Sequence, residues 1–260
     1  MEFRLLVETQ DPHDLPSIVL EERHWTITEP LDISSPSDVP QYICISFVWG
    51  SGRTSNPIHP TVEMSDHTLP AVTAAIRNHD PDHSASMIWI DAFCMPIELL
   101  AGRATLESMG FIYSRATQVV VVLSNEAFAA IEEMSQLDTA KISSSAADIL
   151  DVLENDAWMR SVWTYQEVVN SQDLLFTGHG MFGKFIRGES FLNRFGHYLH
   201  TWKGANGYNS FDLREKYPCL DAFEDVVLDW RMAGYQERSA LQVISQMDRR
   251  CTMEPCCGVC

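Results

Sequence analysis

Apolar residues between positions 42 and 124 form three nearly continuous runs, separated by segments of helical spacing. The runs Tyr42–Trp49, Ser86–Phe93 and Gln118–Ser124 have the length and composition of strands that are buried on both faces. Residues 68–79 and 103–116 carry apolar side chains at the spacing of amphipathic helices. Because strands and helices alternate, the pattern predicts an α/β fold, with a parallel sheet covered by helices on both faces.

The regions on either side of this pattern differ from it. Residues 1–40 contain two short strand candidates, at 3–8 and 24–28, and a connection rich in Ser, Pro and Asp. From about residue 188 onward, longer amphipathic patterns predict a helical region. We therefore divide the chain into N-terminal strands and linker at 1–40, an α/β domain at 41–187, and a helical extension at 188–260 with a cysteine-rich end.

The later part of the α/β domain contains less regular patterns. Residues 126–156 have helical spacing that Ser143–Ser145 interrupt, as an insertion would. The stretch 158–169, WMRSVWTYQEVV, predicts a further helix, and residues 173–178 predict the next strand.

That helix carries one acid in an otherwise apolar setting. Arg160, Trp163 and Glu167 would share one helical face, because they are spaced at i, i+3 and i+7. A carboxylate beside an indole is partly desolvated, which raises its pKa, whereas a nearby guanidinium lowers it. Carboxylates tuned in this way perform acid–base and cation-stabilising chemistry. The structural alternative is a surface ion pair between Arg160 and Glu167, with Trp163 filling the core.

Composition narrows the choice of partners. The chain has 36 acidic against 18 basic residues and a net charge of −18, which opposes binding to nucleic acid. No apolar run approaches the roughly 18 residues of a membrane span. The N-terminus lacks the basic start and long apolar core of a secretory signal, so we expect a cytoplasmic protein with no membrane contact.

The cysteines and glycines offer weaker signals. Four of the seven cysteines crowd into residues 251–260 without a nearby histidine, so we expect no metal site there. Cys94 could be a nucleophile at the end of a strand or a small core residue. Residues 178–185, GHGMFGKF, resemble phosphate-binding glycine motifs, but Phe185 replaces the required hydroxyl and Lys203 stands where an acid is expected. We interpret this motif as a glycine turn and expect no cofactor.

Three blocks resemble the fungal heterokaryon-incompatibility (HET) domain in order and spacing. They are YICISFVWG, then IWIDAFCM followed by MGFIYSRATQVVVVLS, then WMRSVWTYQE, and together they extend over residues 42–178. HET domains are similar to Toll/interleukin-1 receptor (TIR) domains, which are flavodoxin-like α/β folds. Some TIR domains hydrolyse NAD⁺ at the nicotinamide glycosidic bond when they self-associate. The resemblance therefore implies a TIR-like sheet and self-association.

The resemblance also implies roles for individual residues. WTYQE is similar to the TIR segment in which a tryptophan precedes the catalytic glutamate by four residues, so Glu167 inherits the catalytic role. A carboxylate at the ribose would stabilise the oxocarbenium ion and orient water. The residues assigned to substrate binding are Ser46, Trp49, Arg53, Asp91, Arg160 and Trp163.

The sequence departs from the family pattern at two places, and these departures leave more than one function possible. Met95, Pro96 and Ile97 replace a polar run after Cys94, and Ser161 stands where an arginine is usual. The first hypothesis is a hydrolase that takes NAD or NADP as substrate and acts in fungal non-self recognition and cell death. The alternatives are a non-catalytic HET-like interaction module, or a HET-like enzyme recruited to specialised small-molecule chemistry.

Overall fold

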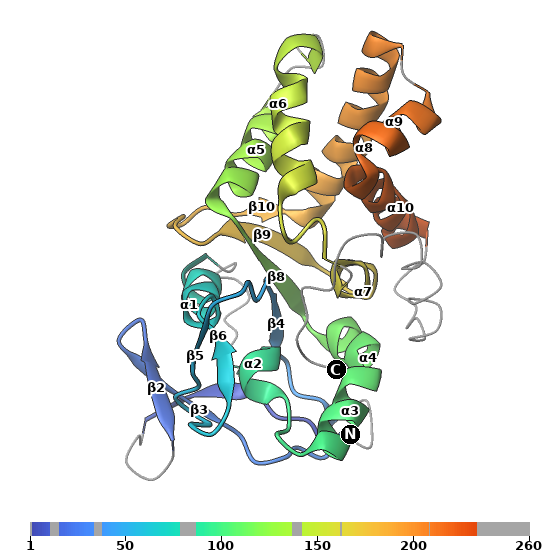
Figure 1. Cartoon of the computed structure of the whole chain (residues 1–260). Helices are drawn as coiled ribbons and strands as arrows, with labels where there is room; N and C mark the ends of the chain where they lie inside the picture. The colour runs from blue at the N-terminus through green and yellow to red at the C-terminus, as the bar shows by residue number, and fades with distance from the viewer. Residues whose placement is uncertain are drawn as a thin grey trace.

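A computed structural model describes residues 2–10, 16–33, 38–78, 87–136, 142–161, 163–207 and 209–232 of the chain. The strands are β1 (Leu6–Thr9), β2 (Ser17–Leu20), β3 (Arg23–Ile27), β4 (Ile43–Ser46), β5 (Arg53–Ser55), β6 (Glu63–Ser65), β7 (Met87–Trp89), β8 (Gln118–Leu123), β9 (Leu174–Gly178) and β10 (Ile186–Arg187). Within the described residues they form an eight-stranded sheet, in the order β10-β9-β8-β4-β7-β1-β3-β2, and a small ribbon of β5 and β6. Figure 1 shows this sheet running through the molecule, with the N-terminal strands at one end and β9 and β10 at the other.

The centre of the sheet is parallel, as the three apolar runs predict. Strand β4 pairs in parallel with β7 on one side and with β8 on the other, and β8 pairs in parallel with β9. Every residue of β4, β8 and β9 is buried. The β-branched run Val119–Val122 suits a strand that is covered on both faces. The predicted α/β class is confirmed.

The outer strands are antiparallel, so the sheet as a whole is mixed rather than parallel. Strand β1 lies antiparallel to β7, with Leu6 opposite Ile88, and β3 and β2 continue the sheet from β1. At the other edge, β10 returns antiparallel to β9. The N-terminal strands therefore extend the central sheet. The division of the chain at residues 40 and 187 stays a prediction.

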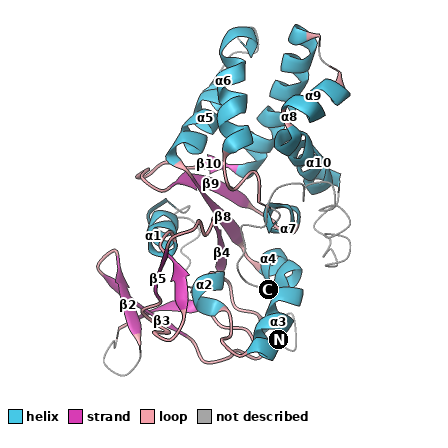
Figure 2. Ribbon diagram, in the orientation of Figure 1, coloured by secondary structure: helices cyan, strands magenta, loops and turns pink. Residues whose placement is uncertain are grey.

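Helices cover both faces of the sheet, as Figure 2 shows. Within the described residues they are α1 (Thr68–Asn78), α2 (Asp91–Cys94), α3 (Leu99–Glu107), α4 (Met109–Arg115), α5 (Asn125–Gln136), α6 (Ile142–Asn155), α7 (Trp163–Val169), α8 (Gly188–Asn206), α9 (Ser210–Lys216) and α10 (Pro218–Met232). Helices α4 and α7 pack on the face that carries Cys44 and Ser46, and α1 packs against β4, β8 and β9 from the other face.

Two predicted elements are shorter than expected. The strand predicted over Ser86–Phe93 ends at Trp89, because the chain turns into α2 at Asp91. The helix predicted over 103–116 is two helices, α3 and α4, separated at Ser108. The Ser108 hydroxyl donates to the carbonyl of Ala104, a local bond by which serine competes with regular helix continuation.

Two further predictions about helices are wrong. Ser143–Ser145 lie inside α6 rather than interrupting it, because the apolar residues Ile149, Leu150 and Leu153 commit the segment to the core. Serine lowers helix propensity by only a few tenths of a kcal/mol. The helix predicted over 158–169 begins at Trp163, after a turn at 157–160.

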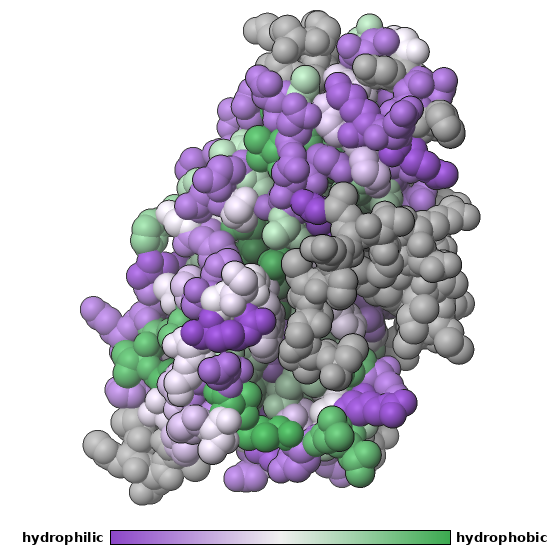
Figure 3. Space-filling view, in the orientation of Figure 1, coloured by the Kyte–Doolittle hydropathy of each residue, from purple (hydrophilic) through white to green (hydrophobic). Residues whose placement is uncertain are grey.

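The predicted helical C-terminal region is confirmed for its described part. Helices α8 and α10 correspond to the two amphipathic patterns, and the polar segment between them contains α9. Helix α8 ends at Asn206, and the next residue, Gly207, has a φ of 69°, which suits a residue without a side chain. In the view of Figure 3, this end of the molecule is mainly hydrophilic on its surface.

Some predictions concern segments outside the described residues, namely the cysteine-rich end at 251–260 and the last residues of the helical extension. Within the described part of the chain, no helix is long and apolar enough to cross a membrane. The same part contains no group of three or more His, Cys, Asp or Glu side chains placed to bind a metal ion.

Candidate functional site

Ser46 is the last residue of β4 and the only polar one in that strand, and its hydroxyl lies at the centre of a buried hydrogen-bond network. Its Oγ donates to Oε2 of Glu167 at 2.5 Å and accepts a hydrogen bond from the indole Nε1 of Trp158 at 2.7 Å. Strands β7 and β8 end beside β4, so the network lies at the edge where the parallel strands end, called here the carboxyl edge. Ligands of open α/β sheets bind at this edge.

Glu167 reaches the network from α7, and hydroxyl groups hold both of its carboxylate oxygens. Tyr113 of α4 donates to Oε1 at 3.1 Å, and its ring packs edge-on against Trp89 of β7. Only 9% of Glu167 is exposed, and within the described residues it forms no ion pair. A carboxylate is therefore buried here with neutral donors and without a compensating cation.

This environment shifts the pKa of Glu167. Its pKa is raised to about 7. Burial is the largest cause of the rise and the nearby carboxylate of Asp91 adds to it, whereas interactions with Ser46, Tyr113 and Trp158 oppose it. The group therefore exchanges its proton near neutral pH, where a general acid or base is most effective.

Asp91 and Trp49 form a second pair at the same edge. Asp91 lies two residues after the end of β7, at the start of α2, and its Oδ2 accepts a hydrogen bond from the indole Nε1 of Trp49 at 2.8 Å. Burial raises the pKa of Asp91 to about 6, against the hydrogen bonds from Trp49 and from the Ala92 amide. Gly50, which follows Trp49, has a φ of 62°, and a side chain there would meet the ring of His67.

Arg53 supplies a cation beside this pair. Its guanidinium lies over the Trp49 ring, 5.7 Å from the centroid, and donates to the carbonyls of Gly50 and Gly52. Its side chain is exposed. Five of the residues chosen from sequence are thus placed at the carboxyl edge by the structure: Ser46, Trp49, Arg53, Asp91 and Glu167.

The other two residues do not have the predicted arrangement. Arg160 lies in the turn before α7, so it does not share a helical face with Glu167, and it is exposed. Trp163 does precede Glu167 by one turn of α7, but 42% of it is exposed. Trp163 therefore does not fill the core, and the helical face that was predicted to carry both Arg160 and Glu167 does not form. The catalytic role of Glu167 stays a prediction.

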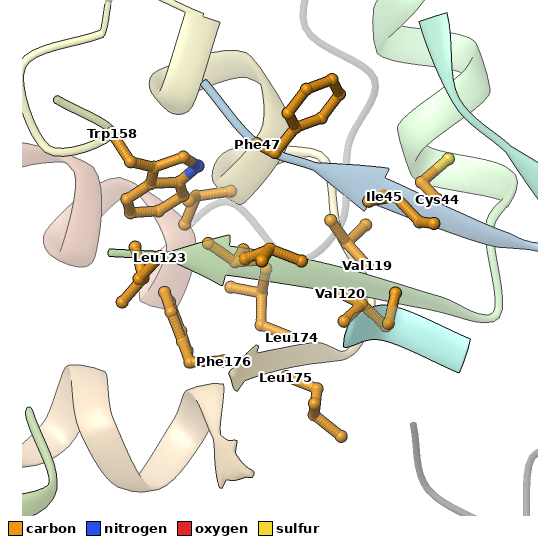
Figure 4. Close-up of a cluster of buried hydrophobic side chains, with 14 of the residues drawn as sticks. Cys44, Ile45, Phe47, Val119, Val120, Leu123, Trp158, Leu174, Leu175 and Phe176 are labelled. Atoms are coloured by element: carbon orange, nitrogen blue, oxygen red, sulfur yellow. The ribbon is translucent and has the colours of Figure 1, made fainter. Parts of the chain in front are cut away.

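Trp158 and Tyr113 are the functional residues that sequence reasoning missed. Trp158 precedes α7 and lies against Phe176 and Phe223, with ring centroids 5.6 and 6.0 Å away. Figure 4 shows its indole at the edge of the apolar cluster, near Leu123 and Phe176. Both Trp158 and Tyr113 look like core residues in the sequence. The feature that could have identified them is the polar group on each ring, since the N–H of a buried tryptophan and the O–H of a buried tyrosine usually need a hydrogen-bond partner.

Cys94 is excluded as a nucleophile. Its side chain is completely buried, and burial raises the pKa of its thiol to about 12, despite opposing backbone hydrogen bonds. A thiol of this kind remains protonated and unreactive at neutral pH.

One family of known proteins matches the segment of the chain that contains this network. Residues 42–167 match the family model described as heterokaryon incompatibility protein (HET). Comparison with curated proteins and with solved structures found no match. The matched segment begins one residue before β4 and ends on Glu167 itself, so it contains every residue of the buried network. Residues 42–167 of this chain are therefore a heterokaryon incompatibility (HET) domain.

Proposed function

We propose that this HET domain hydrolyses the bond between nicotinamide and ribose in NAD⁺ or NADP⁺, with Glu167 as the catalytic carboxylate. The HET match supports a function related to heterokaryon incompatibility. The enzymatic step, self-association and a role in cell death are parts of the proposal. The observation that carries it is the buried carboxylate of Glu167, which has neutral hydroxyl partners and a pKa raised to about 7. Acids that only stabilise a fold are usually paired with a cation when buried.

The proposed reaction breaks one bond and forms one. The bond between ribose C1′ and the pyridinium nitrogen breaks, and nicotinamide leaves as a neutral molecule with the electron pair. Ionised Glu167 stabilises the positive charge that develops on the ribose. Water then attacks C1′ and loses a proton to the carboxylate, which gives ADP-ribose or its 2′-phosphate, and a proton is released to solvent.

The surrounding residues suit the remaining parts of such a substrate. Arg53 offers an exposed guanidinium, which matches the diphosphate. The Trp49 ring, fixed by its hydrogen bond to Asp91, offers a flat surface for a base. Trp163 is exposed one turn from Glu167 and is available to cover the nicotinamide. Ser46 and Tyr113 orient the carboxylate itself.

The test is nicotinamide release from NAD⁺ and NADP⁺ by the full chain at high protein concentration. We expect Glu167→Gln to abolish turnover while the protein stays folded. Glu126→Gln, at an exposed position in the first turn of α5, is the matched control and should retain the wild-type rate. Because the reaction needs ionised Glu167, the rate should rise with pH through about 7.

A second candidate function is a non-catalytic interaction module. It is favoured by the small exposed fraction of Glu167, 9%, and by the hydrogen bonds to both of its oxygens, which would also suit a purely structural acid. If wild type shows no turnover and Glu167→Gln unfolds more easily at every pH, the module is correct and the hydrolase is not.

A further inference from the structure

Asp156 connects the end of α6 to the turn that carries Trp158. Its Oδ1 accepts hydrogen bonds from the backbone amides of Trp158 at 2.9 Å and Met159 at 3.3 Å. Its Oδ2 accepts a hydrogen bond from the hydroxyl of Ser124 at 2.8 Å, directly after β8. Only 7% of Asp156 is exposed. The carboxylate therefore ties the turn at 157–160 to the carboxyl edge of the sheet.

The turn held by Asp156 determines where the Trp158 ring lies. Phe176 of β9 and Phe223 of α10 pack against the indole in T-shaped arrangements, and its Nε1 donates to Ser46 Oγ. A serine hydroxyl has one hydrogen to donate and lone pairs that accept. Because Trp158 supplies the hydrogen that Ser46 accepts, the hydrogen of Ser46 itself is directed to Glu167.

We propose that Asp156 is a positioning residue for Glu167, which it orients through Trp158 and Ser46. Asp156 touches neither Glu167 nor the reacting atoms in this chain of contacts. It fixes the turn, the turn fixes the indole, and the indole sets the direction of the Ser46 hydroxyl. This inference rests on the proposed function only in treating Glu167 as the catalytic carboxylate.

The proposal has a measurable consequence for Glu167. The hydrogen bond from Ser46 and the nearby indole N–H of Trp158 lower its pKa, against the larger effect of burial. When Asp156 no longer holds the turn, these bonds lengthen or break while Glu167 stays buried. The pKa of Glu167 should then rise, by roughly one unit for the loss of a hydrogen bond to the charged form.

The experiment is an NMR titration of the full chain, with ¹³C in the glutamate carboxyl groups and ¹⁵N in the tryptophan indoles. Glu167→Gln and Trp158→Phe assign the two resonances. In wild type, both should titrate with a shared midpoint near pH 7. In Asp156→Ala we expect the Glu167 midpoint to rise by about one pH unit and the Trp158 indole to stop following it. Asp156→Asn keeps an acceptor for the two amides and should stay close to wild type.

Control variants separate positioning from general loosening of the fold. Asn78→Ala removes the hydrogen bonds of a buried side chain to the backbone of Met181 and Gly183, and it should lower stability without moving the Glu167 midpoint. If Asp156→Ala does not fold, Ser124→Ala, which removes the bond to Oδ2, should give a smaller rise in the same direction. An unchanged midpoint in whichever of these two variants folds would overturn the proposal.

The titration does not depend on turnover, so the two proposals can fail separately. A raised midpoint in a protein that does not hydrolyse either nucleotide would keep Asp156 as a positioning residue and reject the hydrolase. In an active protein, Asp156→Ala should shift the pH profile of kcat upward and lower kcat at pH 7 by up to about tenfold, with a smaller change in KM.

Discussion

At the scale of single residues, Ser46 is the smallest member of the network, and it forms hydrogen bonds with both Trp158 and Glu167. Ser46→Ala removes the acceptor of the Trp158 indole and a donor to Glu167 in one step. Since both groups are buried, we expect the free energy of unfolding to fall by about 2–4 kcal/mol. Urea unfolding would measure this. Ser135→Ala, which truncates an exposed serine on α5, should change stability by less than about 0.5 kcal/mol.

Glu167 should make stability depend on pH with a defined sign. The folded protein holds this proton up to a pKa of about 7, whereas the unfolded chain releases it near 4.5. The folded state therefore binds more protons in this window, and its free energy of unfolding falls as pH rises from about 4.5 to 7.

Glu167→Gln removes this contribution but leaves that of Asp91 in place. The stability of the variant relative to wild type should therefore increase across the same window, by at most about 3 kcal/mol, and level off above it. Thermal or urea unfolding of both proteins between pH 5 and pH 8 would check it. A constant difference would mean that Glu167 is ionised throughout.

The two tryptophans before Glu167 should differ sharply in their effect on stability. Trp158→Phe removes the donor to Ser46 and part of the contact with Phe176, and we expect a loss of about 2–3 kcal/mol. Trp163→Phe alters an exposed ring, and its effect should stay within about 0.5 kcal/mol. Equal losses in the two variants would contradict the structure.

At the scale of elements, a side chain of α6 caps the first turn of α10 and so joins the two helices. The two carboxylate oxygens of Glu154, near the end of α6, accept the backbone amides of Cys219 and Leu220 at 2.9 and 3.0 Å. These amides belong to the first turn of α10, where backbone donors lack helical partners. Pro218 opens the helix and has no amide hydrogen to satisfy.

We therefore expect Glu154→Ala to lower the free energy of unfolding by about 1 kcal/mol, as the loss of a helix cap does. Amide exchange in the first turn of α10 should speed up more than exchange in α8. Asp151→Ala removes the same charge from an exposed position of α6 and serves as the control. Equal effects of the two substitutions would show that charge, rather than capping, is responsible.

At the scale of the whole molecule, the N-terminal strands complete the sheet next to the HET domain. They pair with β7 through β1, and they bury Phe3, Leu6 and Trp25 in the same core cluster as β4. The HET match starts only at residue 42, so the strand β1 that borders the domain lies outside it.

Removal of residues 1–40 should therefore prevent stable folding. The truncated chain would expose the backbone edge of β7 and the apolar surface that the N-terminal strands cover, both of which promote aggregation. Size-exclusion chromatography and circular dichroism of the truncated chain would test this. A monomeric, cooperatively folding product would show that the HET domain is independent of these strands.

The sequence by itself determined those strands and helices that can be recognised from the pattern of residues within a single segment. Long apolar runs identify the central parallel strands, because a strand buried on both faces needs no polar positions. Helical spacing identifies α1, α8 and α10. The WTYQE motif singles out Glu167, and the family match ends at that residue.

Only the tertiary structure decided which side chains surround Glu167. Its partner Ser46 is 121 positions away in the chain, and Tyr113 is 54 positions away. Asp156 forms a turn that delays the start of α7 to Trp163, so helical spacing selects the wrong tryptophan. Contacts between elements of a folded sheet depend on how the strands and helices are packed, and spacing within one segment carries no information about that packing.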